Sequence, residues 1–268
     1  MSELLEGFDN GVLTLTINRP DAHNTLTAGL TDALMDTLGR TVDNPEVRCV
    51  VLTGAGRVFC AGGDVGDQAS CANFYPDLSQ QEADAALVAV IRHGSDLATM
   101  LHEMPKPTLA IMPGAAAGAG LALALACDFR FCLDTAKLTT AYANIGLSGD
   151  VGLSYFLPRL VGSAKARELF FTADVITGRE ALEIGLVTKV ASADAFADEA
   201  RAYAARLAAL PTVAIGFMKE NLRVSERGSL GEVLDVEAVN VVRAMRTEDH
   251  QRAAAAFVKR ETVEFEGR

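Results

Sequence analysis

The sequence predicts an α/β protein with a largely parallel sheet, followed by a helical C-terminal region. Short apolar runs of strand length alternate with segments of helical periodicity along the first two thirds of the chain, a pattern typical of repeated strand–helix units. From Ala193 onward only helical periodicity remains. The chain has 268 residues, of which 50% are hydrophobic, so it can bury a substantial core. The composition changes near Ser192, and we therefore expect a core at 1–192 and a helical region at 193–268.

The individual elements are predicted in order along the chain. Val12–Asn18 alternates apolar and polar residues before a proline, as a half-buried strand does. Apolar residues at positions 30, 34, 38 and 42 then mark one face of a helix. Further strands are predicted at Cys49–Thr53, Thr108–Met112, Phe129–Cys132 and Leu186–Val190, with helices at Asp84–Glu103 and Ala164–Phe171. Later helices are predicted at Asp194–Leu210, Val213–Glu226, Leu230–Met245 and Glu248–Val258.

Charge and cysteine content exclude several classes of protein. A net charge of -11 argues against a nucleic-acid partner, because no basic stripe is present to contact phosphates. The five cysteines lack metal-ligand spacing, which predicts reduced thiols in the cytoplasm and no metal site, with Cys60 and Cys127 as core residues. Met1–Glu6 is acidic where a signal peptide is basic. The apolar stretch Thr108–Cys127 is split by Pro113-Gly114, which favours a buried strand–turn–helix over a membrane span.

Two segments rich in glycine and alanine each follow a predicted strand. They are Phe59–Asp64 and Pro113–Gly120, about fifty residues apart. Small residues let a ligand approach the backbone and leave peptide N–H groups available as donors. If two such donors converged on one point, they would form an oxyanion hole, which stabilises negative charge on a carbonyl oxygen.

These segments belong to an ordered set of motifs. The set comprises Asn18-Arg19-Pro20-x-x-x-Asn24-x-Leu26, Phe59-Cys60-Ala61-Gly62-Gly63-Asp64, Lys106-Pro107, Pro113-Gly114, Ala126-Cys127-Asp128, Ile145-Gly146-Leu147, Phe156-Leu157-Pro158-Arg159-Leu160-Val161-Gly162 and Glu180-Ala181-Leu182-x-x-Gly185-Leu186-Val187. In this order and spacing the chain resembles the crotonase (enoyl-CoA hydratase/isomerase) superfamily over roughly residues 10 to 260. Each motif alone is weak, whereas the ordered set is specific.

The resemblance implies a spiral of ββα units, a C-terminal helical region that assembles a homotrimer or a dimer of trimers, and an acyl-CoA thioester substrate. It implies no separate cofactor, because coenzyme A is part of the substrate. By the same resemblance, the backbone N–H groups of Ala61 and Ala119 would hold the thioester oxygen. Contacts to CoA are implied for Ala22, Ala61, Gly63, Asp64, Phe257 and Lys259.

The chain departs from the family pattern where hydratases carry their two catalytic glutamates. The matching positions hold Ala122 and Tyr142. Alanine has no titratable group, and a phenol is a poor base at neutral pH. Asp150 matches instead the aspartate base of dienoyl-CoA isomerases and the nucleophilic aspartate of chlorobenzoyl-CoA dehalogenases. We therefore expect a double-bond isomerase of enoyl-CoA or dienoyl-CoA, in which Asp150 moves a proton between carbons.

Three other functions stay open at this point. Asp150 alone could orient water in a non-standard hydratase, or the chain could be an acyl-CoA dehalogenase or hydrolase. The dehalogenase histidine has no match, since His93 is out of register. A CoA-ester binder without activity is the third alternative.

Asp150 could also simply cap the helix that follows it, while Tyr142, Ala122 and Phe74 are expected to line the acyl pocket.

Overall fold

A six-stranded sheet forms the centre of the protein. The computed structural model describes residues 2–63, 75 and 77–268. Every neighbouring pair in this sheet is parallel except the antiparallel pair at its first edge. The strand order is β1 (Leu4–Asp9), β2 (Val12–Ile17), β3 (Cys49–Gly54), β5 (Thr108–Met112), β7 (Phe129–Leu133) and β10 (Lys189–Ala191). The predicted α/β class with a largely parallel sheet is therefore confirmed.

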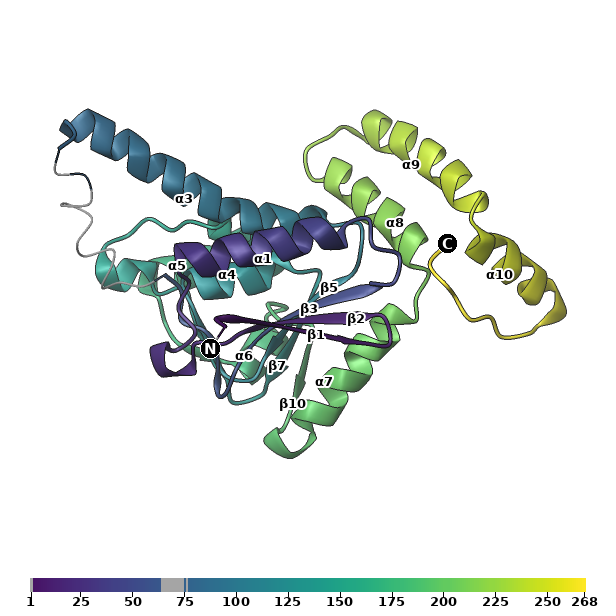
Figure 1. Cartoon of the computed structure of the whole chain (residues 1–268), viewed down its shortest axis with the longest axis horizontal. Coiled ribbons are helices and arrows are strands. Elements are labelled where there is room, and N and C mark those ends of the chain that lie inside the picture. The colour runs from purple at the N-terminus through teal and green to yellow at the C-terminus, as the bar shows by residue number, and fades with distance from the viewer. Residues whose placement is uncertain (1, 64–74, 76) are drawn as a thin grey trace.

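Helices cover both faces of this sheet (Figure 1). On one face lie α1 (Ala28–Thr41), α3 (Gln80–Glu103) and α4 (Ala119–Ala126), and on the other lies α7 (Ala193–Ala208). Residues alternate along β3, so that Val50 and Leu52 enter the larger core while Cys49 and Val51 pack toward α7. Burial on both faces explains why this strand appears in the sequence as a continuous apolar run.

A second sheet has four short strands that the sequence analysis missed. They are β4 (Val58–Cys60), β6 (Ala115–Ala117), β8 (Lys137–Thr139) and β9 (Ile176–Thr177). Of these strands, β4 overlaps the start of the first glycine- and alanine-rich segment, β6 lies within the second, and the two pair in parallel. The predicted strand–turn–helix at 108–127 thus contains an extra strand between the turn and α4.

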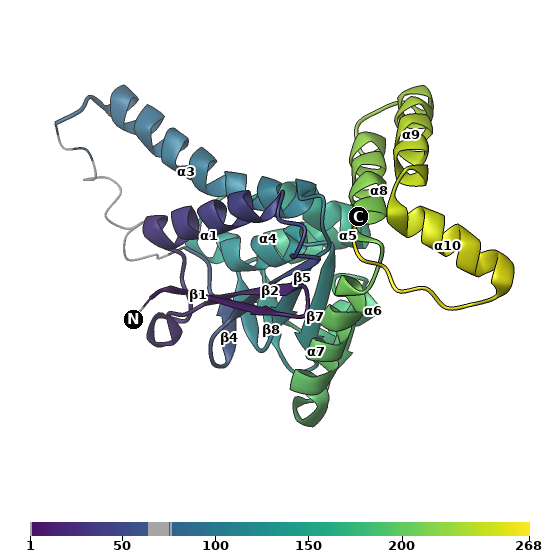
Figure 2. The ribbon, with the colours of Figure 1, turned by 45° about the vertical axis from the view of Figure 1, so that its right-hand side comes forward.

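Three C-terminal helices extend away from this body: α8 (Thr212–Ser225), α9 (Leu230–Met245) and α10 (Glu248–Lys259) (Figures 1 and 2). Their bounds agree with prediction to within one residue. By contrast, α7, which falls in the predicted 193–268 region, packs on the sheet. The path of the chain leaves the sheet only after Leu210.

Two further helices lie between the strands of the second sheet and α7 in sequence: α5 (Leu153–Thr172), which begins eleven residues before its predicted range, and α6 (Gly178–Glu183).

Candidate active site

The two glycine-rich segments meet at the N-terminus of α4. Gly62 has a φ of +97°, a conformation that favours glycine. A Cβ atom there would lie 3.0 Å from the carbonyl oxygen of Ala117 and 3.3 Å from the nitrogen of Ala119. Similarly, a Cβ atom on Gly120 would lie 2.3 Å from the carbonyl oxygen of Cys60. These close approaches require the absence of side chains, and they bring the backbone of the first segment against the first turn of α4.

The structure differs from the sequence prediction at one of the two N–H groups. The N–H of Ala61 donates to the carbonyl oxygen of His23 at 3.1 Å, so it is already engaged. Two residues further on, the N–H of Gly63 has no acceptor among the described residues, and the same holds for Ala119. Ala119 is the first residue of α4, where the helix dipole adds partial positive charge. Among the described residues of these two segments, the N–H groups of Gly63 and Ala119 are therefore left without an acceptor.

A tyrosine and an aspartate lie beside this helix terminus. The Tyr142 ring packs on Gly118, where an added Cβ would lie 3.8 Å from its Cζ, and meets Phe170 edge-on at 6.3 Å between ring centroids. Its hydroxyl donates a hydrogen bond to Oδ1 of Asp150. Burial raises the pKa of Tyr142, and the charge of Asp150 raises it further. The hydroxyl therefore keeps its proton and serves as a donor to the carboxylate.

Unusual backbone conformations hold both partners of this pair. Ala141, just before Tyr142, has a φ of +61°, and Val151, just after Asp150, has a φ of +51°. A left-handed conformation is rare for a β-branched residue and stores strain of about 1–3 kcal/mol. Gly149 and Gly152 also have positive φ, and aromatic rings of Phe170 and Phe156 lie against them. Packing against aromatic rings therefore holds the loop at 149–152 in backbone conformations that Val151 alone would disfavour.

Asp150 does not cap the helix that follows it. The N-cap of α5 is Gly152, and no side chain caps it. Only the backbone carbonyl of Asp150 takes part, by accepting from the N–H of Leu153 at 3.1 Å. The capping hypothesis for this side chain is wrong, because its carboxylate is engaged by Tyr142 instead.

The other predicted site residues are distributed as follows. Ala122 is fully buried one turn into α4 and offers no titratable group. Ala22 ends a short 3-10 turn immediately before His23, whose carbonyl holds Ala61. Phe257 and Lys259 are exposed on α10, on the far side of α8 and α9 from α4 (Figures 1 and 2). One chain therefore does not bring α10 to the Tyr142–Asp150 pair. Asp64 and Phe74 lie outside the described residues.

The cysteines and histidines of the described residues do not form a nucleophilic or metal-binding site beside Asp150. Cys60 and Cys127 are buried, which raises each thiol pKa to about 12, so both are core residues as predicted. His93 is exposed on α3 and pairs with Asp32 of α1 at 2.9 Å. Within the described ranges, no three His, Cys, Asp or Glu side chains come close enough to hold a metal ion. No helix in those ranges is both long and apolar enough to cross a bilayer.

Solved structures define the class of fold. A putative enoyl-CoA hydratase from Streptomyces coelicolor A3(2) superposes with a TM-score of 0.91 at 32% identity, covering 100% of this chain and 95% of that one. The family model for enoyl-CoA hydratase/isomerase matches residues 7–268. The chain belongs to this family, the crotonase superfamily.

Characterised relatives carry different activities. The 1,2-epoxyphenylacetyl-CoA isomerase of Escherichia coli K12 is 32% identical over the full length of both chains. A 4-chlorobenzoyl coenzyme A dehalogenase from Arthrobacter is also 32% identical, over 94% of this chain and 89% of its own. Overall similarity therefore does not select the reaction, and the choice depends on the residues at the site.

Proposed function

We propose that the protein isomerises a carbon–carbon double bond of an enoyl-CoA or dienoyl-CoA, with Asp150 as the proton shuttle. The observation that carries this proposal is the Tyr142–Asp150 hydrogen bond beside the N-terminus of α4. At the two positions where hydratases place glutamates, the chain has Ala122 and a tyrosine whose pKa is raised. One carboxylate is therefore left to act as the base.

The reaction needs one base because it conserves the proton. The Asp150 carboxylate removes a proton from the carbon next to the C=C bond, and the electrons of that C–H bond move through the chain to the thioester oxygen. The carboxylic acid then returns the same proton to a different carbon while the enolate collapses. The double bond has shifted, and both substrate and enzyme have kept their atoms and charge. Proton transfer by a positioned side chain typically contributes roughly 10²–10⁴-fold to the rate.

The enolate oxygen requires hydrogen-bond donors, and the free N–H groups of Gly63 and Ala119 suit this role. Ala61, which the sequence suggested, is engaged by His23. Each oxyanion donor is typically worth roughly 10²–10³ in rate. Ala119 adds the positive end of the α4 dipole to the same point. The methyl group of Ala119 leaves this backbone donor intact.

The relatives do not choose between isomerisation and hydration, because an isomerase and a probable enoyl-CoA hydratase resemble this chain at 32% and 33% identity. A dehalogenase would need a histidine near the aspartate, whereas His93 pairs with Asp32 on the helix surface. Hydration by Asp150 alone stays the competing hypothesis, and a direct assay separates the two.

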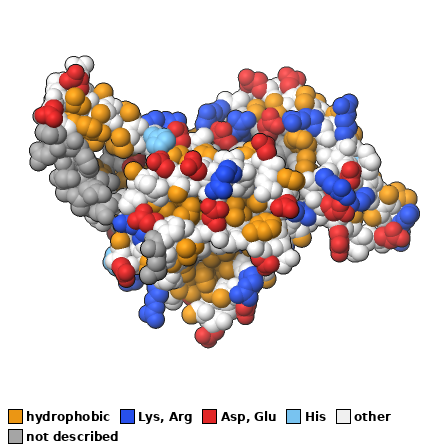
Figure 3. Space-filling model, viewed as in Figure 1, with side chains coloured by type: hydrophobic (Ala, Val, Ile, Leu, Met, Phe, Trp, Pro, Cys, Tyr) orange, Lys and Arg blue, Asp and Glu red, His pale blue; other side chains and the backbone are white. Residues whose placement is uncertain are grey.

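We further propose that coenzyme A binds along the loop at Ala22 and Gly63, and that Phe257 and Lys259 reach the CoA of a neighbouring copy in a homotrimer. The side chain of Phe257 is 84% exposed, and its helix lies away from α4 of the same chain. Apolar side chains on α8 and α9 are also more than half exposed, and Figure 3 shows hydrophobic surface over these helices. They are Met218, Leu222, Leu230, Leu234, Val241 and Met245.

The deciding experiment combines two assays on the wild type and on Asp150→Asn. A β,γ-enoyl-CoA tests isomerisation through the absorbance of the conjugated product, and deuterated buffer tests whether the product keeps the proton of the substrate. Crotonyl-CoA tests hydration through loss of that absorbance. We expect isomerisation by the wild type and a loss of at least 100-fold in Asp150→Asn. Asp198→Asn on the surface of α7 is the matched control.

Three outcomes would overturn the proposal. Wild-type turnover by Asp150→Asn removes the role of this residue, and hydration faster than isomerisation makes the chain a hydratase. Acyl-CoA binding without isomerisation or hydration identifies a binder without activity.

A further inference from the structure

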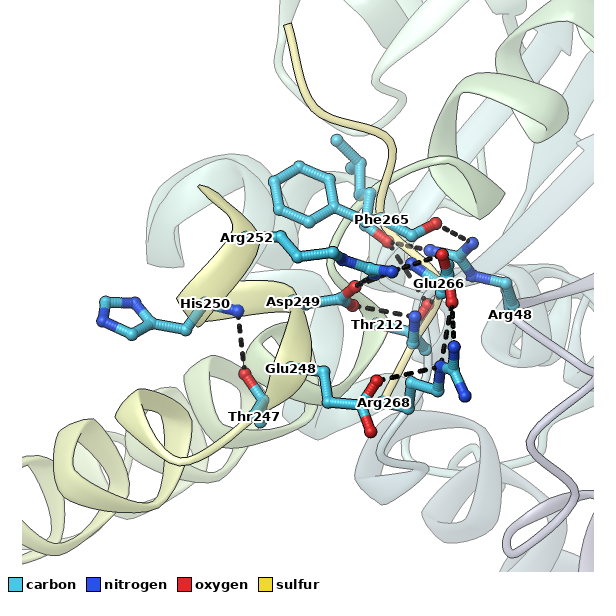
Figure 4. Close-up of polar contacts among 12 residues, drawn as sticks. Arg48, Thr212, Thr247, Glu248, Asp249, His250, Arg252, Phe265, Glu266 and Arg268 are labelled. Atoms are coloured by element: carbon cyan, nitrogen blue, oxygen red, sulfur yellow. Dashed lines mark hydrogen bonds and ion pairs between the residues drawn. The ribbon is translucent and has the colours of Figure 1, made fainter. Parts of the chain in front are cut away.

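The C-terminal tail returns from the end of α10 to the body of the protein (Figures 1 and 4). Arg260 ends α10 with a φ of +60°, a left-handed residue that turns the chain out of the helix. Residues 265–268 then run past the first turn of α10 and reach the start of α8. We name these four residues the strap.

One end of the strap is bound by Asp249 in the first turn of α10. Its side chain is nearly fully buried and accepts hydrogen bonds from the N–H groups of Glu266 at 2.7 Å and Gly267 at 2.8 Å. Its own N–H donates to the carbonyl of Arg268 at 2.9 Å, and Arg252 pairs with both Asp249 and Glu266. Burial raises the pKa of Asp249, but these bonds outweigh burial and hold it below its usual value. A charged carboxylate with several donors is a strong anchor.

The other end of the strap is bound by Arg48, the residue immediately before β3. Its Nη1 group donates to the carbonyl of Phe265. The same guanidinium donates from Nη2 to the carbonyl of Leu210 at 2.7 Å and from Nε to Oγ1 of Thr212 at 3.2 Å. Figure 4 shows these groups converging from three separate parts of the chain. One side chain of the core thus ties the strap to the linker between α7 and α8.

This arrangement attaches α10 to the core. The first of the C-terminal helices, α8, is already held there by other contacts, since Lys219 pairs with Asp128 at 2.6 Å and the hydroxyl of Tyr155 donates to Glu226 at the end of α8. By contrast, α10 packs on α9, and among the described residues the ion pairs that its side chains make outside the helix go to the strap. The strap therefore connects α10 to the point where the chain enters α8, at residues 209–212.

We propose that the strap locks α10 onto the core, and that full affinity for coenzyme A esters requires it. The second half rests on the proposed function, in which α10 supplies Phe257 and Lys259 to the CoA site. Release of the strap leaves the catalytic pair untouched, because Asp150 and Tyr142 are held by α4, α5 and their own loop. The strap is therefore a positioning element and not part of the reacting site.

Two variants test the lock: Asp249→Asn, and a chain that ends at Glu264. Asp198→Asn is the control, because Asp198 and Arg201 form the same i,i+3 ion pair on α7 without any tail. Amide hydrogen exchange is measured for each protein, together with the calorimetric Kd for crotonyl-CoA. We expect exchange in α10 to accelerate at least tenfold while α8 and the central sheet are unchanged. If α10 then keeps its position about a tenth of the time, the Kd rises about tenfold.

The readouts separate the two halves of the proposal. Unchanged exchange in α10 for both variants, or acceleration spread evenly over the sheet, would show that no lock exists. Faster exchange in α10 with an unchanged Kd would refute the link to CoA affinity. Failure of the wild type to bind crotonyl-CoA would count against the proposed function, while the exchange data would still decide the lock.

Discussion

Replacement of Tyr142 by phenylalanine tests whether this residue positions the base or merely lines a pocket. The change removes one oxygen atom and keeps the ring that packs on Gly118 and Phe170. Asp150 then loses the hydroxyl that donates to its Oδ1 atom. A pocket wall would tolerate this change, whereas a group that holds the base would not.

The expected magnitude follows from the type of bond. A hydrogen bond to a charged group contributes about 1.5–3 kcal/mol. Because a tenfold change in rate corresponds to about 1.4 kcal/mol, kcat should fall roughly 10- to 100-fold if the whole bond energy orients the carboxylate. The KM should change less than about twofold, because the ring and the backbone donors of Gly63 and Ala119 are unchanged.

Tyr155→Phe is a closely matched control. The Tyr155 hydroxyl also donates to a carboxylate, that of Glu226, and also sits near the start of α5. We expect both variants to lose similar stability in urea unfolding, but only Tyr142→Phe to lose turnover in the isomerisation assay. Wild-type kcat in Tyr142→Phe, or an equal loss in both variants, would refute the positioning role.

Two further predictions concern packing and pH. Gly62→Ala should lower the free energy of unfolding by roughly 1–3 kcal/mol and reduce kcat, because a Cβ at this positive φ lies 3.0 Å from the carbonyl oxygen of Ala117. The control is Gly94→Ala, where a Cβ on α3 would meet open space. Equal stability of the two proteins would contradict the prediction. Burial raises the pKa of Cys49, Cys60, Cys127 and Cys132 from 9.0 to about 12, so the folded state keeps protons that the unfolded chain loses. The free energy of unfolding should therefore fall as pH rises from about 9 toward 12, by about 1.4 kcal/mol per pH unit for each thiol. In urea unfolding at about pH 9–11, the free energy of unfolding of Cys60→Ala should fall less steeply with pH than that of the wild type.

The sequence predicted the parts of the fold whose signals are local. The strand at Thr108–Met112 and the helix at Leu230–Met245 have the predicted bounds, because a continuous buried run and a regular apolar face each define an element. β1 was missed because most of its side chains are exposed and carry little periodic signal. The strands β4 and β6 were missed because three residues are too short for a periodic signal, and their mutual pairing is a contact between distant parts of the chain.

At the site, motifs identified Asp150 but not how it is held. The hydrogen bond from Tyr142 to Asp150 lies between Ala141 and Val151, which both have a left-handed backbone conformation. Valine rarely adopts this conformation, so the sequence does not predict it. Similarly, the choice between Ala61 and Gly63 as a donor depends on the distant carbonyl of His23. Both features arise from contacts that no short window of sequence contains.

The count of titratable groups is what separates the competing reactions. Hydration across a double bond adds a hydroxyl group and a proton, and the family performs it with two carboxylates. Here Ala122 contributes nothing, and the buried Tyr142 hydroxyl, with its raised pKa, donates to Asp150 and does not act as a base. A single carboxylate can complete isomerisation, because the proton that it removes from one carbon is the proton that it delivers to another. Restoring a carboxylate by Ala122→Glu should therefore raise crotonyl-CoA hydration more than isomerisation, and an unchanged ratio of the two rates would contradict this reasoning.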